Sequence, residues 1–365
     1  MFNERIHNFN AGPSAIPLAV LKKAQSEFLN FEGTGMSIME MSHRSKEFEA
    51  VLARAINGVK SLLNIPDEYA ILFLQGGASL QFSMVPMNLA TPGKKIDLIQ
   101  TGVWTQKAHK EAQKQAEVHI AASSEPDKFM RLPALNEIQI SPDASYVHMC
   151  SNNTIYGTEF NEYPKPPAHI PLIADMSSNI LSRPFDIQQF GLVFAGAQKN
   201  LGPSGVTLVI IKKELAERAD KALPAMLQYR TYIAENSLYN TPPTFGIYML
   251  ALMVEHLIAL GGLKAVEVRN IAKAKTLYDE IDRTGFFKCP VKKEDRSRMN
   301  VVYRIKGGDE NLEKEFVQEA EAAGLAGLKG HRSAGGLRAS IYNPVEQASI
   351  DALVKFMQDF ERRKG

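Results

Sequence analysis

Short apolar runs recur along the first two thirds of the chain, and polar or helix-like segments separate them. The runs are five or six residues long and rich in β-branched and aromatic side chains, a pattern that favours buried strands; they cover residues 69–74, 95–100, 145–150, 170–175, 191–195 and 206–211. Segments such as residues 105–116 carry the helical pattern between them. Strands that alternate with helices predict an α/β fold, in which helices cover both faces of a mostly parallel sheet.

The pattern changes after Gly262. Residues 263–282 keep their apolar side chains near helical spacing and predict one long amphipathic helix that joins two parts of the chain. Strand-like and helix-like segments then alternate again over a shorter stretch, at residues 299–305, 310–324, 337–343 and 343–363. We therefore expect a large domain followed by a smaller C-terminal α/β domain.

The most apolar long stretch, residues 245–262, contains Glu255 and His256 and ends in a glycine pair. These features favour a buried core helix over a membrane span. We expect no membrane association.

Composition excludes several partners. The 42 basic and 40 acidic residues leave a net charge of +2, too small to indicate nucleic acid or an anionic membrane as the main partner. The two cysteines, Cys150 and Cys289, have no metal-ligand or redox spacing, and their scarcity favours a reducing compartment. The N-terminal residues lack the apolar segment of a signal peptide. We expect a cytoplasmic protein without a metal site.

Candidate chemistry lies where the predicted strands end. Lys199 stands on the connection between the runs 191–195 and 206–211, and Asp175 ends the run 170–175. Taken alone, Lys199 reads as a solvated lysine and Asp175 as a helix cap. Ligands of open α/β sheets bind at the carboxyl ends of the strands, however, so an acid and a lysine at two such ends indicate a paired site.

A third strand end predicts an anion site. Gly76 and Gly77 allow a tight turn, and Ala78 and Ser79 open a helix whose N–H groups suit a phosphate, although Ser79 could simply cap that helix. Trp104, the only tryptophan, follows another strand. Pyridoxal phosphate would use all of these groups: a lysine for its aldehyde, a carboxylate for its pyridine nitrogen, a helix N-terminus for its phosphate and an aromatic ring for stacking.

Eight stretches of this sequence are similar to one family in order and spacing. They are NFNAGPS (8–14), MSHRS (41–45), QGGASLQF (75–82), CSNNTIYGTE (150–159), IADMSSN (173–179), AGAQKNLGPSG (195–205), YNTPPTF (239–245) and KGHRSAGGLRASIYN (329–343). On these motifs the chain resembles the phosphoserine aminotransferases, class V pyridoxal-phosphate enzymes of fold type I. The resemblance implies a large cofactor-binding domain at residues 16–262 with a mostly parallel seven-stranded sheet. It implies a small domain at residues 263–365 that includes residues 1–15, and a homodimer with shared active sites.

The resemblance also implies roles for individual residues. Lys199 matches the imine-forming lysine, Asp175 the partner of the pyridine nitrogen, and Asn240 and Thr241 residues that reach the phosphate from the neighbouring subunit. The other expected cofactor contacts are Gly77, Ala78, Ser79, Trp104, Thr154 and Gln198. Arg338 is expected to bind the α-carboxylate of the substrate, and the pairs His43–Arg44 and His331–Arg332 a second anion, because two such pairs exceed the need of one carboxylate.

The reaction implied is the transfer of the amino group of L-glutamate to 3-phosphohydroxypyruvate through a pyridoxal-phosphate imine on Lys199. Its products are 2-oxoglutarate and O-phospho-L-serine, as serine biosynthesis requires, and phosphohydroxythreonine of vitamin B6 (pyridoxine) synthesis is a further candidate substrate. The alternatives are a class V aminotransferase for small amino acids, a cysteine desulfurase, and a non-catalytic protein that binds a phosphorylated metabolite. The apolar surroundings of Cys150 and Cys289 argue against the desulfurase.

Overall fold

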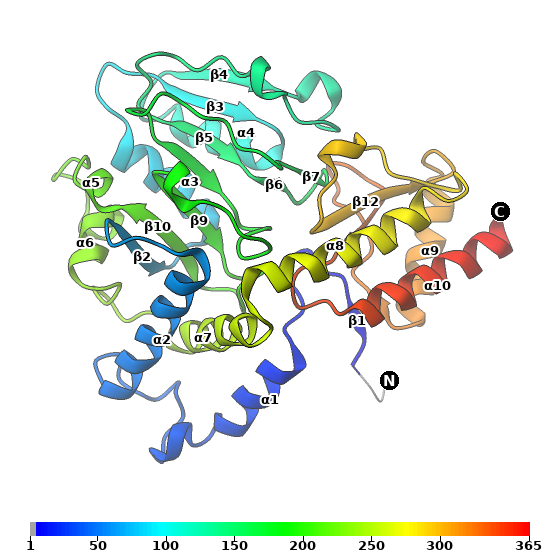
Figure 1. The fold of residues 1–365 in the computed structure, drawn as a ribbon, viewed down its shortest axis with the longest axis horizontal. Coiled ribbons are helices and arrows are strands. Elements are labelled where there is room, and N and C mark those ends of the chain that lie inside the picture. Colours follow the sequence, from blue (N-terminus) through cyan, green and yellow to red (C-terminus); the bar gives the residue numbers. More distant parts are fainter. Residues whose placement is uncertain (1–4) are drawn as a thin grey trace.

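The computed structural model describes residues 5–365, and a seven-stranded sheet forms its centre (Figure 1). The strand order is β2-β10-β9-β8-β5-β3-β4. Only β10 is antiparallel to its neighbours. The strands are β2 (Tyr69–Leu74), β3 (Ile96–Gln100), β4 (Val118–Ser123), β5 (Val147–Cys150), β8 (Leu172–Asp175), β9 (Leu192–Gly196) and β10 (Thr207–Lys212). This confirms the predicted α/β class and the mostly parallel sheet.

Six of these strands coincide with the apolar runs, and β4 is the one that the sequence pattern missed. Strand β4 pairs only with β3, at one edge of the sheet, and most of its residues are partly exposed. An edge strand needs fewer apolar residues than a central one, so its run VHIAAS gives a weaker signal.

Helices cover both faces of the sheet. Helices α1 (Leu18–Glu27), α2 (Lys46–Leu63) and α7 (Thr244–Ala259) pack with Ile71 and Phe73 of β2. Helices α3 (Gly77–Leu89), α4 (Val103–Ala112), α5 (Lys213–Ala216) and α6 (Tyr229–Ala234) pack with Ala70, Leu72 and Leu74 of the same strand. Successive residues of β2 thus serve opposite faces, as the two-residue period of a strand dictates.

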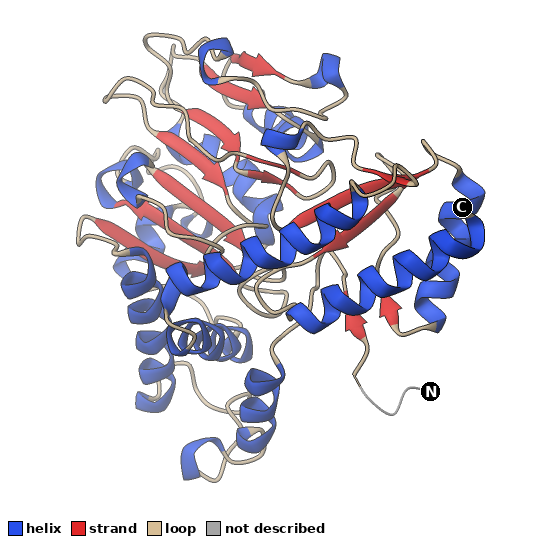
Figure 2. Ribbon diagram, turned by 45° about the vertical axis from the view of Figure 1, so that its right-hand side comes forward, coloured by secondary structure: helices blue, strands red, loops and turns tan. Residues whose placement is uncertain are grey.

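A second, smaller sheet lies beside the first (Figure 2). Its strands β11 (Phe287–Lys288), β12 (Asn300–Ile305) and β14 (Leu337–Ser340) are antiparallel. They share a core with α8 (Gly262–Ile281), α9 (Glu310–Ala322) and α10 (Gln347–Lys364). The long helix α8 matches the predicted segment 263–282, and it contributes Leu263 to one core and Leu277 to the other.

Two short strand pairings complete the fold. Strand β1 (His7–Asn8) pairs with β13 (Leu325–Ala326), so the N-terminal segment joins the C-terminal unit. Phe9 lies in the core of that unit. Strands β6 (Asn152–Asn153) and β7 (Thr158–Glu159) form a hairpin directly after β5.

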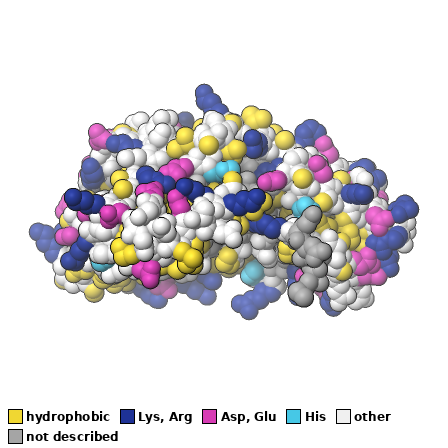
Figure 3. All heavy atoms as spheres, turned by 90° about the horizontal axis from the view of Figure 1, so that it is seen from below, with side chains coloured by type: hydrophobic (Ala, Val, Ile, Leu, Met, Phe, Trp, Pro, Cys, Tyr) yellow, Lys and Arg dark blue, Asp and Glu magenta, His cyan; other side chains and the backbone are white. Residues whose placement is uncertain are grey.

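Helix α7 covers most of the apolar segment 245–262, for which the sequence predicts a buried core helix. Ten of the residues of α7 are buried. No single helix of residues 5–365 is long and apolar enough to cross a membrane, although α7 and α8, bent by 84° at their junction, meet the length and composition criteria together. On the face in Figure 3, basic and acidic side chains are intermingled, in keeping with the small net charge.

Candidate active site

Lys199 lies in the turn after β9, at the carboxyl edge of the sheet. Its ammonium nitrogen Nζ donates a hydrogen bond to Thr154 Oγ1 at 2.8 Å and lies 5.5 Å from the ring centroid of Trp104. Burial lowers the pKa of Lys199 from its usual value, and the carboxylate of Asp175 opposes this shift only in part. The amine of Lys199 is therefore partly buried beside the ring of Trp104, unlike that of a solvated surface lysine.

Asp175 ends β8, the strand beside β9, and is buried. Its Oδ1 accepts hydrogen bonds from the backbone N–H of Ser177 at 2.9 Å and from Ser177 Oγ at 2.6 Å. Burial raises the pKa of Asp175, whereas the positive charge of Lys199 and the bonds from Ser177 act in the opposite direction. The structure brings the acid and the lysine together, as the paired-site interpretation requires.

The turn after β2 forms an N-terminus open to an anion. Gly76 and Gly77 have φ angles of 84° and 63°, which side-chain-bearing residues rarely adopt. Helix α3 then begins at Gly77, and its cap position is Gly76, without a side-chain hydrogen bond. Ser79 is exposed and is not the cap residue, so the interpretation of Ser79 as a simple cap is wrong. The free N–H groups at this terminus suit a phosphate.

Two further predicted cofactor contacts lie nearby. Gln198 precedes Lys199, and its carbonyl accepts a hydrogen bond from the backbone N–H of Ser14 in the N-terminal segment. Asn240 Nδ2 donates to Gln75 Oε1 at 3.1 Å, immediately before the Gly76–Gly77 turn, while Thr241 is exposed.

Arg338 of β14 reaches the same place from the C-terminal unit. Its NH1 group donates to the carbonyl of Thr154 at 3.0 Å, and burial lowers its pKa. Its Nε is buried and has no partner in residues 5–365. A guanidinium with a free N–H beside Lys199 suits a carboxylate.

The two histidine–arginine pairs, His43–Arg44 and His331–Arg332, differ in their surroundings. Lys329 and Leu337 form an antiparallel bridge, so the loop of His331 and Arg332 begins and ends beside Arg338. Burial and the charges of Arg338, Arg332 and Lys107 lower the pKa of His331. His43 and Arg44 precede α2, and the structure gives their side chains no hydrogen bond or ion pair. Within one chain, the pair His331–Arg332 thus lies near Arg338, and no hydrogen bond or ion pair in residues 5–365 joins His43 or Arg44 to it.

The sequence interpretation missed the polar residues behind this site. Ser178 Oγ accepts from Thr154 Oγ1 at 3.0 Å, and Asn152 Nδ2 donates to Ser178 Oγ at 2.9 Å and to Asn300 Oδ1 of β12 at 2.8 Å. All of these side chains are buried. Residues 176–179 (MSSN) follow Asp175 in the sequence, but the spacing of serines and asparagines does not predict which hydroxyl bonds to which partner.

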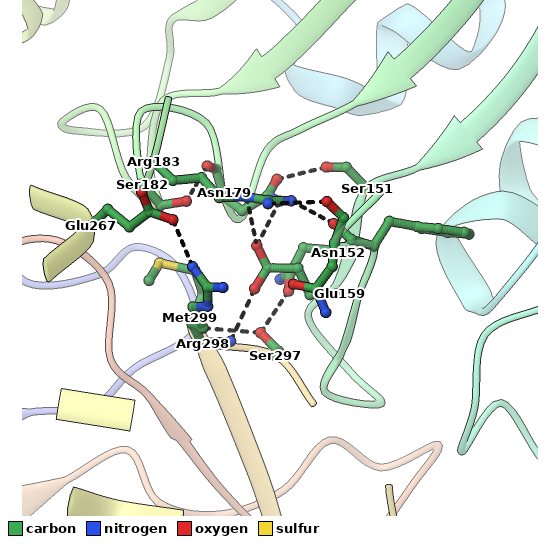
Figure 4. A network of polar contacts seen from close by, with 12 residues as sticks. Ser151, Asn152, Glu159, Asn179, Ser182, Arg183, Glu267, Ser297, Arg298 and Met299 are labelled. Atoms are coloured by element: carbon green, nitrogen blue, oxygen red, sulfur yellow. Dashed lines mark hydrogen bonds and ion pairs between the residues drawn. The ribbon is translucent and has the colours of Figure 1, made fainter. Parts of the chain in front are cut away.

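Figure 4 shows the adjoining part of this network. The carboxylate of Glu159 is buried and accepts hydrogen bonds from Asn179 Nδ2 at 3.1 Å and from the backbone N–H of Arg298 at 3.0 Å. Asn179 in turn accepts from Ser151 Oγ at 2.6 Å. Because buried polar groups are costly without partners, these bonds fix the loops after β5 and β8 against the C-terminal unit.

The residues present fit pyridoxal phosphate. Trp104 Nε1 and Asn240 Oδ1, which belong to two of the predicted cofactor contacts, are among eight buried side-chain atoms without a partner in the described residues. Arg338 Nε, of the predicted substrate contact, is another of the eight. Unpartnered polar atoms at a site are free to bond a ligand. The alternative desulfurase chemistry lacks a nucleophile, since Cys150 and Cys289 are buried and burial raises the pKa of both thiols.

Comparison with known proteins agrees with this geometry. The family model Aminotransferase class-V matches residues 6–353. The chain is 56% identical over 361 residues to the phosphoserine aminotransferase of Geobacillus kaustophilus, with 99% of both chains covered. It is 48% identical to phosphoserine aminotransferase 1, chloroplastic, of Arabidopsis thaliana, with 99% of this chain and 83% of the relative covered.

Solved structures agree as well. The phosphoserine aminotransferase from Bacillus circulans subsp. alkalophilus superposes with a TM-score of 0.97 at 52% identity, covering all of both chains. The PLP-bound phosphoserine aminotransferase from Trichomonas vaginalis superposes with a TM-score of 0.93 at 40% identity, covering 97% of this chain and 100% of the other.

Proposed function

The chain belongs to the aminotransferase class-V family, and from this premise we propose the roles of its site residues in phosphoserine transamination. The reaction moves the amino group of L-glutamate to 3-phosphohydroxypyruvate and yields 2-oxoglutarate and O-phospho-L-serine. The observation that carries the assignment is the position of Lys199 Nζ, which is bonded to Thr154 and faces Trp104 beside the buried Asp175.

Pyridoxal phosphate, the cofactor of this family, supplies an electron sink for the negative charge that develops at the substrate Cα. In our proposal Lys199 binds it covalently, Asp175 holds the positive charge of its pyridine nitrogen, and Trp104 covers its ring. Gly77, Ala78 and Ser79 at the N-terminus of α3 would hold its phosphate, with Gln198 as a further phosphate contact, and the hydroxyl of Thr154 would lie near its ring. The uncapped N–H groups of α3 and the enclosed carboxylate support these assignments.

Lys199 also moves the proton. Its Nζ would take the proton from the substrate Cα and hold it at the reacting side, a role that needs a neutral amine. Because burial lowers the pKa of Lys199, the neutral form becomes accessible closer to neutral pH than for a free lysine. The hydroxyl of Thr154 holds the amine at the reacting side of the site.

Arg338 binds the α-carboxylate of each substrate, and its unpartnered Nε supports this role. We assign the second anion, the phosphate of 3-phosphohydroxypyruvate or the γ-carboxylate of glutamate, to His331 and Arg332, with His43 and Arg44 completing the site across a homodimer interface. The side chains of His43 and Arg44 make no hydrogen bond or ion pair within residues 5–365, which supports a role for them at a partner's site.

An apolar groove supports the homodimer. It has a volume of about 540 Å³, and Phe28, Leu29, Phe245 and Pro203 line it. The side chain of Leu29 is 83% exposed, and Met36 and Met39 add further exposed apolar surface. Such a patch is typical of an interface. In our proposal a second copy covers this groove, and Asn240 and Thr241 contact the partner's phosphate, as the family resemblance implies. The two free cysteines favour a cytoplasmic location.

We propose a domain boundary near the start of α8, with residues 16–262 in the large domain. Residues 263–365 then form the small domain together with residues 1–15, of which residues 1–4 lie outside the described part of the chain. The separate core around β12, which includes Phe9 of the N-terminal segment, supports this division.

The test follows the visible absorbance of the purified protein. We expect a yellow band that bleaches on addition of glutamate, and a borohydride-reduced adduct that peptide mapping places on Lys199. Lys199→Ala should lose the adduct and about 10²- to 10⁴-fold in rate, the usual contribution of a positioned proton-transfer group.

Lys221→Ala, at an exposed lysine outside the site, is the matched control and should retain both. A protein that stays colourless with pyridoxal phosphate, or an adduct on another lysine, would show that the assignment of Lys199 is wrong.

A further inference from the structure

A second cavity lies away from the proposed active site and contains none of its residues. Its volume is about 640 Å³. It is a partly open cavity lined by residues near the bent junction of α7 and α8, by the segment Pro17–Ala19 and by residues 343–348, which lead into α10. Leu257 and Leu263 at the junction belong to the core of the large sheet, and Val345 belongs to the C-terminal core. The cavity therefore adjoins both units.

Lys273 of α8 lines this cavity and is only 3% exposed. Its Nζ donates to the carbonyls of Ile341 at 3.0 Å and Tyr342 at 2.7 Å, and it forms no ion pair with a carboxylate in residues 5–365. An ammonium has three donors, so one remains after these two bonds. Burial, with the charge of Arg269 added, lowers the pKa of Lys273 to about 7. A buried cation without an anion is costly, and an added anion would stabilise it.

Two more basic side chains line the same space. Arg269 has no hydrogen bond or ion pair in the described part of the chain, and its charge lowers the pKa of both His256 and Lys273. Burial is the larger cause for both groups. Glu346 is the one carboxylate of the lining; it raises the pKa of His256 but lies outside ion-pair distance of the three basic groups. The exposed Arg269 and the buried Lys273 thus bring positive charge to one space, and His256, whose pKa is lowered, adds a ring nitrogen to it.

Helix α10 adds backbone donors to this wall. Its first residues, Gln347 and Ala348, line the cavity, and its cap residue Glu346 makes no side-chain hydrogen bond to the helix. The side chain of Gln347 donates elsewhere, to Thr276 Oγ1 at 3.2 Å and Asp351 Oδ1 at 2.9 Å. The first N–H groups of an uncapped 18-residue helix carry a partial positive charge that favours an anion.

We propose that this cavity is a second ligand site, which binds the phosphate group of a small phosphorylated metabolite between Lys273, Arg269 and the N-terminus of α10. The cavity is of a size typical of small-molecule sites, about 300 to 1,000 Å³. A planar guanidinium, an ammonium and backbone N–H groups together match the oxygens of a phosphate. Because the walls come from both units, the ligand would also bridge the large sheet and the C-terminal core.

The test uses the holoenzyme labelled in its histidine rings, titrated with inorganic phosphate at constant ionic strength and about pH 6.5, where Lys273 is mostly protonated. We expect the ring signal of His256, identified with His256→Gln, to shift and saturate. Arg269→Gln should weaken this binding about tenfold, the value of a charge-assisted hydrogen bond. Lys264→Gln removes an exposed charge from the same helix outside the cavity and should leave the titration unchanged.

The signal of His256 separates this site from the active site, where phosphate also binds. A His256 signal that does not respond to phosphate, or one that titrates alike in the wild type and in Arg269→Gln, would overturn the proposal. A response to succinate but not to phosphate would overturn the assignment to phosphate. None of these titrations depends on turnover, so a negative result would not contradict the proposed transamination.

Discussion

At the scale of single residues, Ser177 sets the position of the carboxylate of Asp175. Its N–H and Oγ both donate to Asp175 Oδ1, and its Oγ accepts from the backbone N–H of Gly196 at 3.1 Å. Gly196 ends β9, the strand that leads to Lys199. The hydroxyl of Ser177 therefore connects the end of β8 to the end of β9 and fixes the position of Asp175 relative to the strand that leads to Lys199.

We predict that Ser177→Ala lowers the rate of transamination about 10- to 100-fold, because loss of a hydrogen bond to a charged group costs about 1.5–3 kcal/mol and frees the carboxylate to rotate. The measurement is kcat and KM together with the absorbance of bound cofactor, which should persist. Ser182→Ala is the control, since the hydroxyl of Ser182 is also buried but bonds to the carbonyl of Asn179. Equal losses in both variants would contradict the role given to Ser177.

At the scale of elements, the contact of α2 with α7 depends on a glycine. Helix α2 has the expected start and stop signals: Ser45 accepts a hydrogen bond from the N–H of Phe48 at 3.3 Å, and Asn64 ends the helix with a φ of 49°. Gly58 is buried in its interior, where glycine is a poor helix former. A Cβ at this position would lie 2.3 Å from Cγ1 of Val254 in α7. Close packing of the two helices explains the glycine.

We predict that Gly58→Ala destabilises the protein by about 1–3 kcal/mol despite the better helix propensity of alanine, because the added methyl overpacks the helix contact. Denaturant unfolding would measure the change. In the double variant Gly58→Ala/Val254→Ala the two substitutions should be less costly together than the sum of their separate effects. Ser61→Ala, on the exposed side of α2, serves as the control. Strict additivity of the pair would contradict the packing explanation.

At the scale of the whole molecule, α8 connects the two units through buried polar contacts. Lys273 binds the carbonyls of Ile341 and Tyr342, and the hydroxyl of Tyr342 donates to the carbonyl of Ala11 at 2.8 Å. Ala11 precedes Gly12, where an added Cβ would lie 3.3 Å from Cγ of Lys199. The segment after β14 and the N-terminal segment thus reach the site together, and Lys273 fixes the first of them.

We predict a pH dependence of stability that belongs to Lys273. The pKa of this group is about 7 in the fold and 10.5 ordinarily, so between these values the unfolded chain binds a proton that the folded chain does not. The contribution of Lys273 to stability therefore rises with pH from about 7 to 10.5, at about 1.4 kcal/mol per pH unit. Below pH 7 the folded protein bears the full cost of burying the charged ammonium.

Unfolding of the wild type and of Lys273→Met in phosphate-free buffer would measure this contribution. The difference in stability in favour of the wild type should grow as the pH rises through this window. A difference that stays constant with pH would contradict the lowered pKa.

The sequence by itself determined the α/β class, six of the seven strands of the large sheet, the long helix α8, and Lys199 and Asp175 as a paired site. These features follow from local periods of apolar residues and from the rule that polar residues at the carboxyl ends of parallel strands converge. The sequence did not predict strand β4, because an edge strand is only half-buried and has a weak apolar pattern.

Only the tertiary structure decided which polar groups meet. Arg338 bonds to a residue 184 positions away, and Asn152 to one 148 positions away. The cavity of Lys273 likewise assembles from the N-terminal segment, the α7–α8 junction and the start of α10. Apolar periodicity reports whether a residue is buried but not its partner, because a hydrogen bond depends on the distance and direction between two atoms that only the packed chain brings together.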